Sequence, residues 1–116
     1  MSGLHWTKQA WASRDSREPH WLEVRFAQPA QVSRVWLYWA VDGARVQASR
    51  AYTILGLTGQ GTVELARVED APGGVTVSRH EFPPTLLHGV RVEQPEGGGP
   101  AHRPGIMWLR EICAAP

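Results

Sequence analysis

The stretch that decides the fold of this protein is VSRVWLYW, residues 32–39. Its side chains alternate along the chain, which places Val35, Leu37 and Trp39 on one face and the intervening residues on the other. A period of two is typical of a half-buried β-strand. We therefore expect a strand whose first face lies in a hydrophobic core.

The preceding stretch, WLEVRF at residues 21–26, has the same alternation. Leu22, Val24 and Phe26 form its predicted core face. Gln28-Pro29-Ala30 lies between the two stretches and predicts a turn. Two strands joined by so short a link are expected to be antiparallel neighbours.

Further strands are predicted at residues 51–57, 62–68, 75–82, 89–93 and 106–112. Gly, Pro, Ser and Asp separate these segments, and no window of eleven or more residues shows the spacing of an amphipathic helix. The pattern predicts an all-β antiparallel sandwich of about seven to eight strands. A chain of 116 residues suits one domain, which we take to span 1–116.

Composition excludes several classes of partner. The formal net charge is only +1, so we expect no nucleic-acid partner. The longest apolar run, residues 35–41, is too short for a membrane span, and from the sequence we expect neither a membrane span nor a signal peptide. Cys113 is the single cysteine, so neither an intrachain disulfide nor a cysteine-based metal site is expected.

Three stretches in order carry a resemblance to a known family. They are Trp11-Ala12-Ser13 with PHWLEVRF at 19–26, VSRVWLYW at 32–39 with AYTI at 51–54, and VRV at 90–92 with WLREI at 108–112. Together they resemble the discoidin, or coagulation factor 5/8 type C, superfamily, which includes the family 32 carbohydrate-binding modules. The resemblance implies a galactose-binding-like jelly-roll sandwich that binds sugars, phospholipid head groups or proteins through loops at one end.

The sequence departs from this family at its N-terminus. Relatives have an additional strand and an Asp-Gly loop before the first tryptophan, and that loop often helps to hold a structural calcium. Only ten residues precede Trp11 here. The five histidines are also scattered without the spacing of a zinc site. We therefore expect no metal and no cofactor.

The loop after Trp39, residues 41–50, is the predicted functional segment, because the equivalent loop of sugar-binding relatives contributes polar residues to the site. Asp42 could accept hydrogen bonds from vicinal hydroxyls and Arg45 could donate to sugar oxygens. Asp42-Gly43 as a simple turn, with Arg45 as a solvated charge, is an equal alternative. The full set of predicted ligand-binding residues is Arg17, Trp39, Asp42, Arg45, Arg50, His102 and Arg103.

The sequence thus predicts a non-catalytic carbohydrate-binding module, accessory to a larger secreted or periplasmic glycan-active protein. Its arginines suit an anionic glycan through bidentate pairing, and the resemblance also admits a neutral galactoside. No paired catalytic carboxylates or nucleophilic serine can be assembled. The alternative is a protein-interaction domain of the same fold that binds its partner through an aromatic sheet face of Trp21, Trp36 and Tyr38. The loop at 95–105 could instead cover this face.

Overall fold

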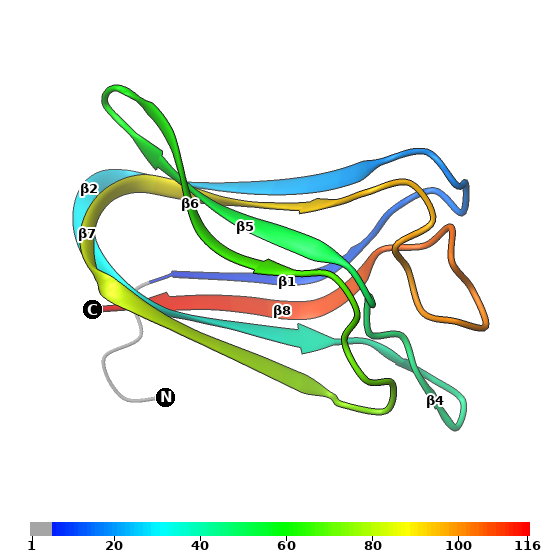
Figure 1. Ribbon diagram of the computed structural model, residues 1–116. Helices are drawn as coiled ribbons and strands as arrows, with labels where there is room; N and C mark the ends of the chain where they lie inside the picture. Colours follow the sequence, from blue (N-terminus) through cyan, green and yellow to red (C-terminus); the bar gives the residue numbers. More distant parts are fainter. Residues whose placement is uncertain (1–5) are drawn as a thin grey trace.

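The computed structural model describes the backbone of residues 6–116 and the side chains of residues 11–116. Within this part of the chain, all regular elements are β-strands and their pairing is antiparallel (Figure 1). The strands are β1 (Trp6–Ala12), β2 (His20–Trp39), β3 (Val41–Asp42), β4 (Arg45–Val46), β5 (Tyr52–Thr58), β6 (Gly61–Val68), β7 (Val77–Gln94) and β8 (Trp108–Ala115). The described residues contain no helix long and apolar enough to cross a membrane. The all-β prediction is confirmed.

Two long strands, β2 and β7, build both layers of the sandwich. They pair with each other from His20↔Gln94 to Tyr38↔Val77 and bend together from one layer into the other (Figure 1). In the first layer, β1, β8, the second half of β2 and the first half of β7 lie side by side. In the second layer, the first half of β2 is followed by the second half of β7, then β5 and β6.

The turn predicted at Gln28-Pro29-Ala30 is wrong. β2 continues through these residues, and its two halves lie in opposite layers instead of pairing with each other. Pro29 falls in the register shift between Arg25 and Ala30, while Pro83 and Pro84 fall opposite the shift between Val32 and Arg34. Proline cannot donate to a ladder and is tolerated where pairing is interrupted, and such bulges bend strands. These prolines therefore mark the bend of two continuous strands.

The predicted core faces are confirmed. Val35 and Leu37 are 0% exposed and Trp39 is 1% exposed, and Leu22 is buried opposite them in the second layer. Leu109 and Ile112 of β8 extend the same core. Each large apolar side chain removed from water contributes about 1.5–3 kcal/mol, which makes this interlayer contact the main source of stability.

Two features of the fold were not predicted. Residues 6–12 form an edge strand whose backbone pairs with β8, with Trp11 opposite Leu109. The loop after Trp39 also contains a minimal hairpin, β3–β4, in which Asp42 pairs with Arg45. Gly43 occupies the turn of this hairpin with φ +63°, a conformation that glycine adopts without strain.

A polar network closes one edge of the core. The indole Nε1 of Trp39 donates to Ser78 Oγ at 2.8 Å, and the Tyr52 hydroxyl lies 2.7 Å from His80 Nε2. The rings of Trp39 and Tyr52 meet edge to face with centroids 5.3 Å apart. Burial lowers the pKa of the His80 imidazole from its ordinary value of 6.5. The neutral form of His80 is therefore the one that fits the fold.

This network makes stability depend on pH. The unfolded chain protonates His80 near pH 6.5, whereas the folded chain does so only at lower pH. Unfolded molecules bind more protons in that window, so the free energy of unfolding falls as pH falls below 6.5 and levels off below the folded-state pKa. Urea unfolding between about pH 7.5 and about pH 5 measures this slope.

The matched variants are His80→Gln and His88→Gln, because His88 is on the same strand but exposed. We expect His80→Gln to flatten the slope and His88→Gln to leave it unchanged. An unaltered slope in His80→Gln would contradict the assignment.

Candidate functional site

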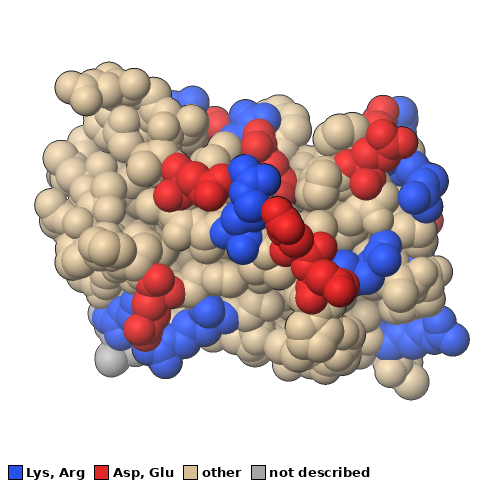
Figure 2. All heavy atoms as spheres, in the orientation of Figure 1, with Lys and Arg blue, Asp and Glu red and all other residues tan. Residues whose placement is uncertain are grey.

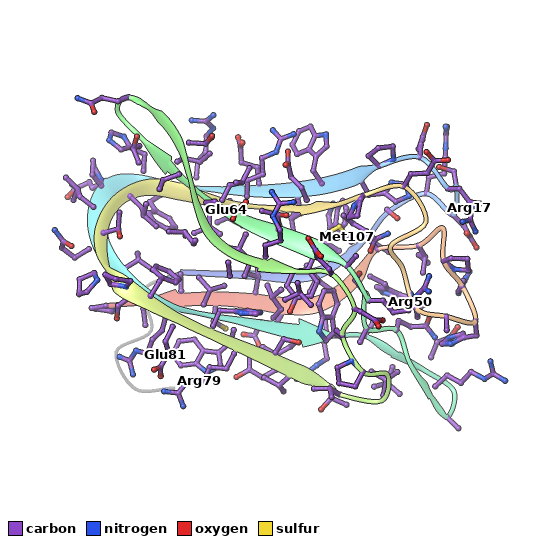
Figure 3. The ribbon with its side chains drawn as sticks, in the orientation of Figure 1. Arg17, Arg50, Glu64, Arg79, Glu81 and Met107 are labelled. Atoms are coloured by element: carbon purple, nitrogen blue, oxygen red, sulfur yellow. The ribbon has the colours of Figure 1, made fainter. Side chains whose placement is uncertain are left out.

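Three segments converge at the end of the sandwich opposite the bend of β2 and β7 (Figure 1). They are the loop at 13–19, the β3–β4 hairpin and the loop at 95–107. Figure 3 places Arg17 and Arg50 at this same end. The sequence placed the predicted site on these loops, and the fold brings them together.

Arg103 connects the three segments. Its Nε lies 3.0 Å from Asp15 Oδ2, and its Nη1 lies 3.7 Å from Asp42 Oδ2. Its guanidinium carbon lies 6.0 Å from the centre of the Trp108 ring. We call Asp15, Asp42, Arg103 and Trp108 the loop-end cluster.

The loop-end cluster remains accessible. The Asp42 side chain is 57% exposed, that of Arg103 is 37% exposed, and Trp108 is half-buried. Carboxylates accept hydrogen bonds, a guanidinium donates several, and an indole face packs against the C–H side of a pyranose. This arrangement can orient a ligand that carries adjacent hydroxyls.

Buried polar contacts hold the loop at 95–107 in place. Gln94 is fully buried, receives a hydrogen bond from Ser49 and donates to Ile106 O at 3.1 Å. His20 Nε2 lies 2.8 Å from both Ser16 O and Gly105 O, so this imidazole joins the loop at 13–19 to the loop at 95–107. The frame of the site is therefore built from residues that do not face solvent.

Arg50 belongs to this frame instead of the binding surface. Its Nε donates to Gly99 O at 2.6 Å and its Nη2 donates to Gly97 O at 2.8 Å. With its guanidinium committed to two loop carbonyls, it is not offered to a ligand. Its place among the predicted ligand residues is corrected accordingly.

Trp39 is also corrected. Its ring is 1% exposed and lies in the interlayer core, so no ligand can reach it. Arg17, Arg45 and His102 are exposed, and they belong to the loop at 13–19, the β3–β4 hairpin and the loop at 95–107, respectively.

Asp15 and Trp108 were not among the predicted ligand-binding residues. Trp108 precedes the buried Leu109, and alternation along β8 directs it away from the core. That signal was available in the sequence. The sequence did not specify the contact between Asp15 and Arg103, because the two residues are 88 positions apart.

The predicted aromatic patch of Trp21, Trp36 and Tyr38 does not exist. Trp21 pairs with Glu93 in the second layer, whereas Trp36 pairs with Cys113 and Tyr38 with Glu111 in the first. The bend of β2 separates these rings onto opposite outer faces.

Within residues 11–116, no group of three or more His, Cys, Asp or Glu side chains is arranged to hold a metal ion. Cys113 is buried, and burial raises the pKa of its thiol to about 12.

The fold of this protein is an antiparallel jelly-roll β-sandwich. No protein-family model and no curated protein matches the sequence. Solved structures do match. The family 32 carbohydrate-binding module of NanJ from Clostridium perfringens, in complex with galactose, superposes with a TM-score of 0.77 at 14% identity, over 92% of this chain and 76% of that one.

Two further structures support the same assignment. The module CpGH89CBM32-5 of Clostridium perfringens, in complex with GalNAc-β-1,3-galactose, gives a TM-score of 0.75 at 10% identity, covering 92% of this chain and 75% of that one. Chitosan-binding module 1 of a chitosanase/glucanase from Paenibacillus sp. IK-5 gives 0.69 at 19% identity, covering 92% and 76%. At such identities the likeness establishes the fold, and the predicted resemblance is confirmed at that level.

Arg50→Ala should test the structural role of this side chain. It removes two charge-assisted hydrogen bonds to partly buried carbonyls, so we expect the free energy of unfolding to fall by about 1.5–3 kcal/mol. Backbone relaxation should show increased motion in residues 95–107. Arg45→Ala, at an exposed hairpin position, should change stability by less than about 0.5 kcal/mol. Unchanged stability and loop motion, with loss of ligand affinity, would instead restore Arg50 as a contact residue.

Gly99→Ala should disturb the same loop by a different route. A Cβ there would lie 2.4 Å from Ile106 O and 2.8 Å from Arg103 O, both backbone atoms. We expect a loss of about 1–3 kcal/mol in thermal or urea unfolding. Gly73→Ala is the matched control, because nothing lies within 4 Å of its Cβ position. Equal stability of the two variants would contradict the tight packing of this loop.

Proposed function

We propose that this protein is a non-catalytic carbohydrate-binding module whose ligand sits at the loop-end cluster. The observation that carries the proposal is the meeting of Arg103, Asp42 and Trp108 at one accessible end. Sugar sites need a few convergent polar groups beside an aromatic surface, in a largely preformed setting. Here the frame of buried hydrogen bonds supplies the preformed setting.

Similar folds support the same ligand class. One matching module was solved with galactose and another with GalNAc-β-1,3-galactose. The lectin domain of Lectinolysin, solved with Lewis b, also matches, with a TM-score of 0.70 at 19% identity. Other matching modules derive from a chitosanase/glucanase and from a family 31 glycoside hydrolase, which supports an accessory role that raises the local concentration of substrate for a tethered catalytic domain.

The loop end offers little for hydrolysis. Glycosidases use two carboxyl groups, one of which must donate a proton to the leaving group. Asp15 and Asp42 instead approach the same guanidinium, that of Arg103. This arrangement supports binding over catalysis.

Two glycan classes suit the loop end. Asp42 and Trp108 suit a neutral galactoside, because a carboxylate accepts from hydroxyls and an indole packs on the ring. Arg17 and Arg45 are exposed and suit the carboxylate or sulfate of an anionic glycan. The two classes are separable by experiment.

A glycan array with neutral galactosides, sulfated glycans and uronic-acid polysaccharides tests the proposal, followed by tryptophan fluorescence titration of each hit. We expect saturable binding that Asp42→Ala weakens tenfold or more, equivalent to about 1.4 kcal/mol. If the ligand is anionic, Arg45→Ala should weaken it as well, with a dependence on salt.

The control is Arg79→Ala, which breaks an exposed ion pair with Glu81 away from the loop end (Figure 3). It should leave affinity unchanged. An array without hits, or binding indifferent to Asp42→Ala, would rule out the loop-end cluster as a sugar site.

A further inference from the structure

A second concave surface lies on the outer face of the second layer. It has a volume of about 630 Å³, within the range of small-molecule sites. We call it the sheet-face hollow, and the lining residues that matter for its chemistry are Trp21, Thr53, Glu64, Arg67, Arg91 and Glu93. Figure 2 shows acidic and basic side chains gathered across the middle of the visible face.

The strand registers explain why these side chains meet. Trp21 pairs with Glu93, and Glu93 pairs with Thr53 on the next strand. Their chain neighbours Leu22, Val92 and Ile54 are buried in the core. Because side chains alternate along each strand, the first set is directed to the outer face.

Arg91 lines the hollow beside an aromatic ring and two carboxylates. Its guanidinium carbon lies 4.1 Å from the centre of the Trp21 ring, and its Nε lies 2.9 Å from Glu93 Oε2. Its Nη1 lies 3.6 Å from Glu23 Oε1, and the side chain is only 27% exposed. Arg67 also forms an ion pair, with its Nη2 2.7 Å from Glu64 Oε1. Polar groups that are already ordered lose little entropy when a ligand binds.

Trp21 supplies an apolar surface beside these groups. The residue is 53% exposed, although Arg91 covers part of its ring. A tryptophan this accessible, next to ordered donors and acceptors, can pack against the C–H face of a pyranose while its hydroxyls reach the charged groups.

We infer that the sheet-face hollow is a second carbohydrate-binding site, separate from the loop-end cluster, that takes neutral pyranose rings. The inference rests on the proposed function for the class of ligand, but on different residues for the site. Pro19 and Pro95 line the hollow and belong to the loops at 13–19 and 95–107. These loops therefore lie between the two sites.

The charges select a neutral ligand. Glu64, Glu69 and Glu93 line the hollow against two arginines, and both arginines already pair with acids. A sulfate or uronate would face an excess of carboxylates and would have to displace one of them from its arginine. Hydroxyl groups can use the acceptors and donors without breaking either pair.

Two sites on one module would increase retention on a polysaccharide. Once one ring is bound, a second ring of the same or a neighbouring chain binds at a high effective concentration. Oligosaccharides that reach both sites should therefore bind more tightly than the monosaccharide does.

Trp21→Ala tests the inference, with galactose and β-1,4-galactotetraose as probes in calorimetry and in NMR spectra of the tryptophan indole N–H groups. In the unmodified chain we expect two binding events, one of which shifts the Trp21 indole signal. Trp21→Ala should remove that event, whereas Trp21→Phe, which keeps an aromatic face, should retain it within about tenfold. Asp42→Ala should remove only the other event.

Trp36→Ala is the matched control. The guanidinium carbons of Arg34 and Arg79 lie 5.6 Å and 5.9 Å from the centre of the Trp36 ring. Trp36 pairs with Cys113 in the first layer, so it lies on the opposite outer face from Trp21. It should leave both events intact. Urea unfolding of each variant establishes that the fold is retained.

The outcomes separate the two proposals. A single event lost in Asp42→Ala, with an unshifted Trp21 signal, would overturn the second site and leave the loop-end proposal standing. A single event lost in Trp21→Ala but retained in Asp42→Ala would overturn the loop-end placement and support the sheet-face hollow. A Trp21 shift caused by sulfated galactan but by neither neutral probe would overturn the neutral specificity.

Discussion

The antiparallel pairing of β2 with β7 is the constraint on which the rest of the structure depends. Because the two strands stay paired while they cross from one layer to the other, every further strand can only add to an edge of this ribbon. β8 and β1 extend it in the first layer, and β5 and β6 extend it in the second. The bend also decides which aromatic residues can act together, since it places Trp21 and Trp36 on opposite faces.

The proposed binding surface at the loop end depends on polar side chains that do not belong to the loop-end cluster. His20, Gln94 and Arg50 each place a polar side-chain atom within hydrogen-bond distance of a backbone carbonyl in the loop at 95–107. A buried carbonyl without a hydrogen-bond partner destabilises a protein by more than one such hydrogen bond stabilises it. These side chains therefore stay bound to the loop carbonyls. The loop-end cluster around Arg103 is therefore already ordered, and it loses little conformational entropy when a ligand binds.

Both candidate sites combine a tryptophan with an arginine between carboxylates, yet their surroundings differ. At the loop end, the exposed Arg17 and Arg45 lie in the same loops as the cluster. In the sheet-face hollow, Arg67 and Arg91 form ion pairs with Glu64 and Glu93. We propose that the same residue types suit different glycans at the two sites, because the net charge left after internal pairing decides which ligand groups can enter. Surface ion pairs of this kind contribute little to stability, which leaves their arrangement free to serve recognition.

The sequence by itself determined the fold class and the core faces of 21–26 and 32–39. Alternation is a local property, so it needs no knowledge of distant residues. Tertiary structure alone decided that Pro29 lies in a bend and that Arg50 supports a loop. It also decided that Asp15 meets Arg103 and that Trp21 stands beside Arg91. The register of β2 and β7 brings Trp21 beside Arg91, whereas Asp15 and Arg103 lie in two loops that are 88 positions apart.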